Sequence, residues 1–217
     1  MHIEPGFIAP AKLALANASA AALLAAHLKG AFRAPAVLLR TLLAALFFSL
    51  FMQSFHMPVG PSELHFVGGM AIYLTLGYFP ALYGFAFGLL LQGLLFEPGD
   101  LMHLAVNSLS LIVPLMAVHH SVGKRLAEGR REMSWQEIVR LDAVYYGGVT
   151  LMVGFWLMIG EAETPFFAWA KFAAAYAPLV LIEPVVTMSA VRLLKRWQEH
   201  KLVDRCFDVR SLRLAAQ

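Results

Sequence analysis

Long apolar segments separated by short polar connections run through the whole chain. They cover residues 8–28, 35–55, 66–78, 80–96, 101–118, 142–160 and 166–194. Most of them approach the length of about 20 residues at which a helix crosses the apolar part of a bilayer. The residues do not alternate between apolar and polar as the strands of a membrane β-barrel do. The pattern predicts an all-α polytopic membrane protein with about seven transmembrane helices, in a single domain over residues 1–217.

The third segment is short for a membrane-spanning helix, which leaves two interpretations of this part of the chain. Residues 66–96 form either two passes or one long helix interrupted at Tyr78, Phe79 and Pro80. Proline favours an interruption because it has no amide donor and often ends or kinks a helix.

The distribution of positive charge favours two passes. Lys and Arg collect at 29–40, at 119–141 and in the tail at 195–217. Cytoplasmic loops carry an excess of these residues, so we expect all three regions to face the cytoplasm. An external N-terminus and a basic cytoplasmic tail then require an odd number of crossings, and seven segments satisfy this.

The connections on the opposite side are acidic. Those near 56–65, 97–100 and 161–165 contain no Lys or Arg. Their acidic residues are Glu63, Glu97, Asp100, Glu161 and Glu163. Such a rim attracts cations, although the same distribution also follows from topology alone.

Composition agrees with a membrane protein. The chain is 59% hydrophobic and 14% charged, whereas soluble domains are about one quarter charged. The formal net charge is +3, and its clustering indicates orientation in a lipid bilayer rather than nucleic-acid binding. The single cysteine, Cys206, cannot form an internal disulfide. No cleavable signal peptide is evident, because the first cation is Lys12.

The first two residues offer a metal chelate. The α-amine of Met1, the amide of His2 and the His2 imidazole can close fused rings around one cation. Three nitrogens in one plane suit Ni(II) or Cu(II). A fourth nitrogen is needed, and His65 is the best candidate on the same predicted side. It follows Gly60 and Pro61 in a segment whose glycines permit irregular backbone.

Four ordered blocks resemble the CbiM/NikM family, the substrate-binding membrane components of energy-coupling-factor transporters for cobalt and nickel. The start MHIEPGF is similar to the family's MHI-x-E-G-F, and residues 60–66, GPSELHF, are similar to G-P-T-S-V-H-L. Residues 92–96, QGLLF, resemble Q-A-L-L-F and are followed by Asn107. Residues 182–187, IEPVVT, resemble I-E-x-x-x-T in the last span.

The resemblance implies a fold with seven helices in which the N-terminal segment, residues 1–7, folds into the outer half. It implies a square-planar nitrogen site from Met1, His2 and His65, with transported Ni(II) or Co(II) as the substrate and no resident cofactor. It also implies a multi-pass protein of the bacterial inner membrane that docks to a transmembrane coupling subunit and to cytoplasmic ATPases. Whether a small accessory membrane subunit is needed stays open, as does the choice between nickel and cobalt.

Several residues depart from the family pattern or carry further chemistry. Glu63 stands where the family has a small residue, and His103 stands where it has an apolar or small one. His103 and Asn107 are four residues apart on one helix face, where they either hold His65 or the terminal segment or pair helices together. Either His103 or Glu63 could also be an alternative ligand. By the hydropathy pattern, Glu183 is the one acid deep in a predicted span. It has either a functional role or a role in holding helices together.

Enzymatic alternatives are less well supported. No GxxxxGK[ST] motif is present, so the chain lacks that motif for ATP hydrolysis and we expect a non-catalytic subunit. His103 and Asn107 superficially resemble part of a rhomboid protease pattern, but the G-x-S-G serine motif is absent. A metal-dependent membrane hydrolase lacks support because no H-E-x-x-H motif occurs.

Overall fold

The chain forms a bundle of long helices. The computed structural model describes residues 2–3, 6–161 and 163–215, apart from the side chain of His2. The principal helices are α1 (Pro10–Ala31), α2 (Pro35–Ser54), α3 (Gly69–Leu76), α4 (Tyr78–Leu95), α5 (Leu104–Val118), α7 (Trp135–Ile159) and α8 (Pro165–Arg196). Shorter helical pieces are the 3-10 helix η1 (Pro98–His103), the π-helix η2 (His119–Gly123), α6 (Lys124–Ala127) and α9 (Lys201–Cys206). The strands are β1 (His2–Ile3), β2 (His56–Val59), β3 (Ser62–His65), β4 (Glu132–Met133) and β5 (Arg213–Leu214).

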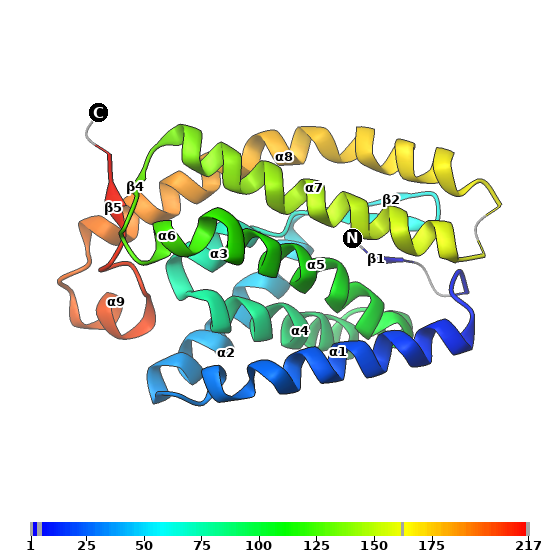
Figure 1. Cartoon of the computed structure of the whole chain (residues 1–217), viewed down its shortest axis with the longest axis horizontal. Coiled ribbons are helices and arrows are strands. Elements are labelled where there is room, and N and C mark those ends of the chain that lie inside the picture. Colours follow the sequence, from blue (N-terminus) through cyan, green and yellow to red (C-terminus); the bar gives the residue numbers. More distant parts are fainter. Residues whose placement is uncertain (1, 4–5, 162, 216–217) are drawn as a thin grey trace.

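The helices run back and forth along one axis (Figure 1). Six helical segments of the described chain are long and apolar enough to cross a membrane, namely α1, α2, α4, α7, α8 and the stretch Pro98–Ala127 that contains α5. β1 and the β2–β3 hairpin lie toward one end of the bundle, and β5 lies at the other. The predicted multi-pass membrane fold is confirmed. The side of the membrane that each end faces stays a prediction.

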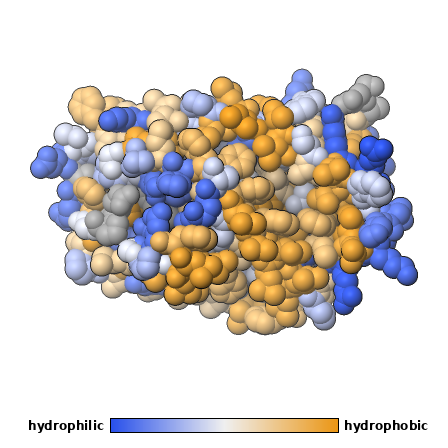
Figure 2. Space-filling model, turned by 180° about the vertical axis from the view of Figure 1, so that it is seen from behind, coloured by the Kyte–Doolittle hydropathy of each residue, from blue (hydrophilic) through white to orange (hydrophobic). Residues whose placement is uncertain are grey.

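The surface fits a lipid environment. Figure 2 shows a broad apolar area across the middle of the molecule, with hydrophilic residues concentrated toward its two ends. Large apolar side chains point outward from this area, and Leu181 of α8 is 77% exposed. In water such a surface would be costly, whereas lipid chains cover it without penalty.

The third predicted pass is a short helix enclosed by protein. α3 has 8 residues, all of them buried, and is about 12 Å long at 1.5 Å per residue. The break between α3 and α4 falls at Gly77, just before the residues Tyr78, Phe79 and Pro80 at which the alternative of one long helix placed an interruption. Gly77 has a φ of 102°, which favours glycine because it has no Cβ. Pro80 lies in the first turn of α4, where a missing amide donor costs little.

The predicted start of the sixth span is wrong. α7 begins at Trp135, seven residues before the predicted span at 142–160, because Ser134 caps it and Arg131 pairs with Glu137 at 2.6 Å. The segment 119–141 is therefore largely helical. The basic tail at 195–217 packs against the rest of the chain. Its strand β5 pairs in parallel with β4, and its apolar side chains Val209 and Leu212 are buried.

A small sheet is set into the helical bundle near the N-terminus. The strand order is β1-β3-β2, and both pairings are antiparallel. Gly60, with a φ of 62°, and Pro61 form the two-residue turn between β2 and β3. β3 has pairing partners on both edges, so its buried backbone is satisfied without a helix. This is how irregular structure can lie within a membrane protein at this depth.

Candidate metal centre

Ile3, in the described part of the N-terminal segment, is held by hydrogen bonds at both its amide and its carbonyl. The Ile3 amide donates to Oδ1 of Asn107 at 3.0 Å. The Nδ1 of His103 donates to the Ile3 carbonyl at 2.8 Å. Ile3 is fully buried, and β1 also contacts α7 and η1. Two polar side chains from the junction of η1 and α5 thus fix the path of the chain immediately after His2.

The pairing of β1 with β3 decides which residues lie beside the terminus. In this register His2 is opposite Glu63, and Ile3 is opposite Ser62. His65 is two residues further along β3, at the end of the hairpin away from its turn. The backbone of His2 is therefore next to the short segment that carries Glu63 and His65. Met1 and the side chain of His2, the other predicted ligands, lie outside the described residues.

The His65 imidazole is buried and has polar groups on both sides. Its Nε2 lies 3.0 Å from Oε2 of Glu63, and its Nδ1 lies 3.4 Å from the Met52 carbonyl. His65 is 1% exposed and Glu63 is 8% exposed. When Nδ1 faces a backbone carbonyl, Nε2 is the nitrogen that can bind a metal ion. The sequence did not reveal either contact.

His56, on the neighbouring strand, stacks against this imidazole. Its Cα is the register partner of His65. The two rings are 6.2 Å apart between centroids, with planes 29° apart. His56 is exposed, so it covers one side of His65 rather than entering the buried site.

Glu183 of α8 contacts the backbone that follows His65. Its Oε1 accepts a hydrogen bond from the Gly68 amide at 2.9 Å, and the next amide, of Gly69, donates to the Tyr146 hydroxyl at 3.3 Å. Gly68 is the residue before α3 and has a left-handed φ of 62°. The carboxylate therefore satisfies an amide at the start of α3, three residues after His65. Glu183 is not the only deep acid, because Asp142 of α7 is also buried.

The acidic rim is partly neutralised. Lys12, near the start of α1, lies 3.5 Å from Glu161 and donates to the Ile159 carbonyl. The connections alone, which contain no cation, overstated the negative charge of this end. Glu63 differs from these exposed acids because it is buried within the sheet.

The histidines at the opposite end have aromatic partners. The His119 ring stacks on Tyr78 with centroids 3.8 Å apart, and its Nδ1 lies 2.9 Å from the Tyr73 hydroxyl. His27 lies 3.3 Å from the Tyr78 hydroxyl. A cavity of about 710 Å³ adjoins this group, and Lys124 also lines it. These histidines pack the end of the bundle far from His65.

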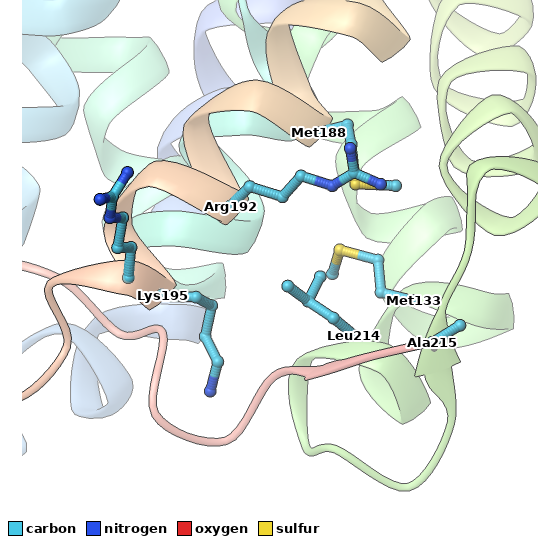
Figure 3. Close-up of a pocket in the computed structure, with 7 residues that line it drawn as sticks. Met133, Met188, Arg192, Lys195, Leu214 and Ala215 are labelled. Carbon is cyan, nitrogen blue, oxygen red and sulfur yellow. The ribbon is translucent and has the colours of Figure 1, made fainter. Parts of the chain in front are cut away.

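A second cavity at that end is basic. It has a volume of about 440 Å³ and lies between β5, β4 and the end of α8. Arg192 and Lys195 extend from α8 beside Met133 and Met188 (Figure 3). Cations repel a divalent metal ion, so neither this cavity nor the histidine group competes with the region around His65 as a metal centre.

Among the described residues, no three side chains of His, Cys, Asp or Glu gather closely enough to hold a metal ion. Glu63 and His65 are adjacent, while His103 is occupied through Nδ1 with the terminal strand. Any site here with four ligands therefore needs donors other than these described side chains. The backbone and the terminal residues are the donors that lie beside it.

Comparison with known proteins agrees with this architecture. The family described as the cobalt uptake substrate-specific transmembrane region, CbiM, matches residues 2–200. The chain belongs to the CbiM family. A solved structure described as a transition metal transporter is similar over 94% of this chain and 96% of that one, with a TM-score of 0.73 and 18% identity. That likeness shows a common fold. A search of curated proteins gives no match.

Membership of the CbiM family makes this chain a transmembrane component of cobalt uptake. It is consistent with a non-catalytic role, and the rhomboid interpretation has no support from the contacts of His103. The structure brings Glu63, His65, His103 and Asn107 around the described terminal strand. The Ser110 hydroxyl, on the same helix as Asn107, donates to the Val106 carbonyl of its own helix.

Proposed function

We propose that this chain is the substrate-binding membrane subunit of an energy-coupling-factor importer for Ni(II) or Co(II). The metal is captured in a plane of four nitrogens. These are the Met1 amine, the His2 amide, the His2 imidazole and the Nε2 of His65. The observation that carries the proposal is the pairing of β1 with β3, which sets the His2 backbone beside the strand that ends at His65.

Three features support this ligand set. His65 is buried, and its Nδ1 faces a backbone carbonyl, which orients the ring for binding through Nε2. Asn107 and His103 hold the Ile3 amide and carbonyl, so the terminal chelate is supported by a fixed backbone. Finally, the described side chains do not supply a metal site by themselves. Such preorganisation raises affinity because less ordering accompanies binding.

Transport requires energy from other chains, because no Walker-type GxxxxGK[ST] sequence occurs here. The outward face of α1 supports docking to a membrane coupling subunit, with cytoplasmic ATPases bound beyond it. Ala14, Ala18, Ala22 and Ala26 are all exposed at four-residue spacing along this helix. Small residues in this arrangement let another helix approach closely within a bilayer.

Metal binding by purified protein with a free N-terminus tests the proposal. We expect one Ni(II) or Co(II) per chain, and loss of binding in His2→Ala and in His65→Ala. One glycine added before Met1 should also abolish binding, because it converts the chelating amine into an amide. His120→Ala is the matched control, since His120 is an exposed histidine at the other end. Normal affinity in the extended protein and in His65→Ala would overturn the proposed site.

A further inference from the structure

Glu63 places a carboxylate directly against the nitrogen that we assign to the metal. Its Oε2 is 3.0 Å from Nε2 of His65. It is also the residue opposite His2 in the pairing of β1 with β3. The carboxylate thus contacts the His65 nitrogen and belongs to the residue that pairs with His2, so it lies within reach of the proposed metal ion.

The sheet fixes the position of Glu63. β3 is the central strand of the sheet, so the backbone of Glu63 is fixed by neighbours on both sides. Pro58 is its register partner on β2. The side chain is 10% exposed, and little water is therefore available to solvate a negative charge. A carboxylate retained in such a place needs a cation or hydrogen-bond donors beside it.

Charge balance supplies the reason for its presence. A divalent ion bound by the deprotonated His2 amide, an amine and two neutral imidazoles leaves a net charge of about +1 in a buried site. A single carboxylate reduces that charge to zero. Asn107, which accepts from the terminal strand, is neutral. Glu63 is therefore in position to neutralise the complex.

We propose that Glu63 is a fifth, axial ligand to the transported ion in this protein. The four nitrogens fill a plane, so an additional donor can approach only from above or below it. Carboxylate oxygen and imidazole nitrogen both bind divalent first-row ions. The inference rests on the proposed function, because it assumes the terminal chelate and His65. It changes the expected geometry from square planar to five-coordinate.

The geometry has a measurable consequence. Planar four-coordinate Ni(II) is diamagnetic and shows a 1s→4p feature before its X-ray absorption edge, whereas five-coordinate Ni(II) with an axial oxygen is generally paramagnetic and lacks a strong feature of this kind. An axial oxygen also reduces the preference for an ion that favours planar coordination. Co(II), which accepts five ligands readily, should therefore bind with affinity closer to that of Ni(II) than in a variant without the carboxylate.

The experiment compares wild type with Glu63→Gln, which preserves shape and removes the charge. Ni(II)-loaded wild type should lack the planar edge feature, and Glu63→Gln should acquire it. Affinity for either ion should fall roughly 10–100-fold in the variant, the range found when groups around a metal ligand are removed. Glu161→Gln is the matched control, because this exposed acid at the same end pairs with Lys12. It should leave the spectrum and affinity unchanged.

The outcomes separate this inference from the proposed function. Loss of metal in His65→Ala, together with a planar spectrum in wild type, keeps the terminal site and overturns axial ligation. If Glu63→Gln binds the metal ion more weakly but keeps the wild-type spectrum, axial ligation is also overturned, because Glu63 would then act through its charge alone. Retained metal in His65→Ala and in the N-terminally extended protein removes both proposals. Glu63→Asp gives a second variant that keeps the charge on a shorter arm, and its spectrum should also become planar.

Discussion

Replacing Asn107 with leucine should release the terminal strand without disturbing the helices. The Ile3 amide donates to Asn107 at 3.0 Å in a fully buried position. Leucine has the same number and branching of side-chain heavy atoms but no acceptor, so the amide loses its partner and has no water to replace it. An orphaned buried donor costs about 1–3 kcal/mol. The His103 bond to the Ile3 carbonyl persists, so we expect local opening rather than unfolding.

The magnitude follows from that free energy. At about 1.4 kcal/mol for each factor of ten, 1–3 kcal/mol raises the open population roughly 5–150-fold. Hydrogen–deuterium exchange of the first eight residues, measured by mass spectrometry, should accelerate by that factor. If the metal binds only the docked segment, Ni(II) affinity should fall by up to the same factor.

Ser110→Ala is the control for this change. Ser110 is buried in α5 near Asn107, but its hydroxyl donates to the Val106 carbonyl within the same helix. Exchange near the N-terminus should stay as in wild type. If Asn107→Leu also exchanges within twofold of wild type and binds metal normally, the anchoring of β1 by this side chain is refuted.

Three further predictions concern the supports of the fold and are tested by thermal unfolding in detergent. Glu183→Ala should lower stability by about 1–3 kcal/mol, because the Gly68 amide loses its acceptor. Glu183→Gln keeps an oxygen acceptor and should be nearly neutral. Equal losses in the two variants would contradict the role of Glu183 as the acceptor for Gly68. Gly77→Ala should destabilise the protein by about 1 kcal/mol or more, because Gly77 has a φ of 102°. Gly147→Ala, inside α7, should be neutral or stabilising, because an added Cβ there meets no atom within 4 Å. The reverse order of stabilities would refute the backbone argument. Asp142→Asn should not lower the melting temperature, because neither buried carboxylate oxygen has a hydrogen-bond partner among the described residues. A large fall in melting temperature would show that the carboxylate makes a stabilising interaction.

The boundaries that the sequence predicted poorly share a physical cause. Charged residues at the start of α7 resemble a loop in the hydropathy pattern, yet Arg131 and Glu137 satisfy each other and allow the helix to begin early. Asp142 escaped notice because it stands at the first position of the predicted span 142–160, whereas its neighbours in space bury it. Hydropathy averages a segment, and it does not record which partner each polar group finds.

The sequence alone determined the membrane class, the principal spans and the family resemblance, because apolar length and clustered charge reflect requirements that the bilayer imposes on each segment separately. It also singled out His65, His103 and Asn107 as candidates. Only the tertiary structure decided what each one contacts. The two residues of β1 are too short to predict as a strand, and their pairing with β3 is an interaction across the fold. The place of Glu63 beside His65 follows from that sheet, since alternate residues of one strand share a face.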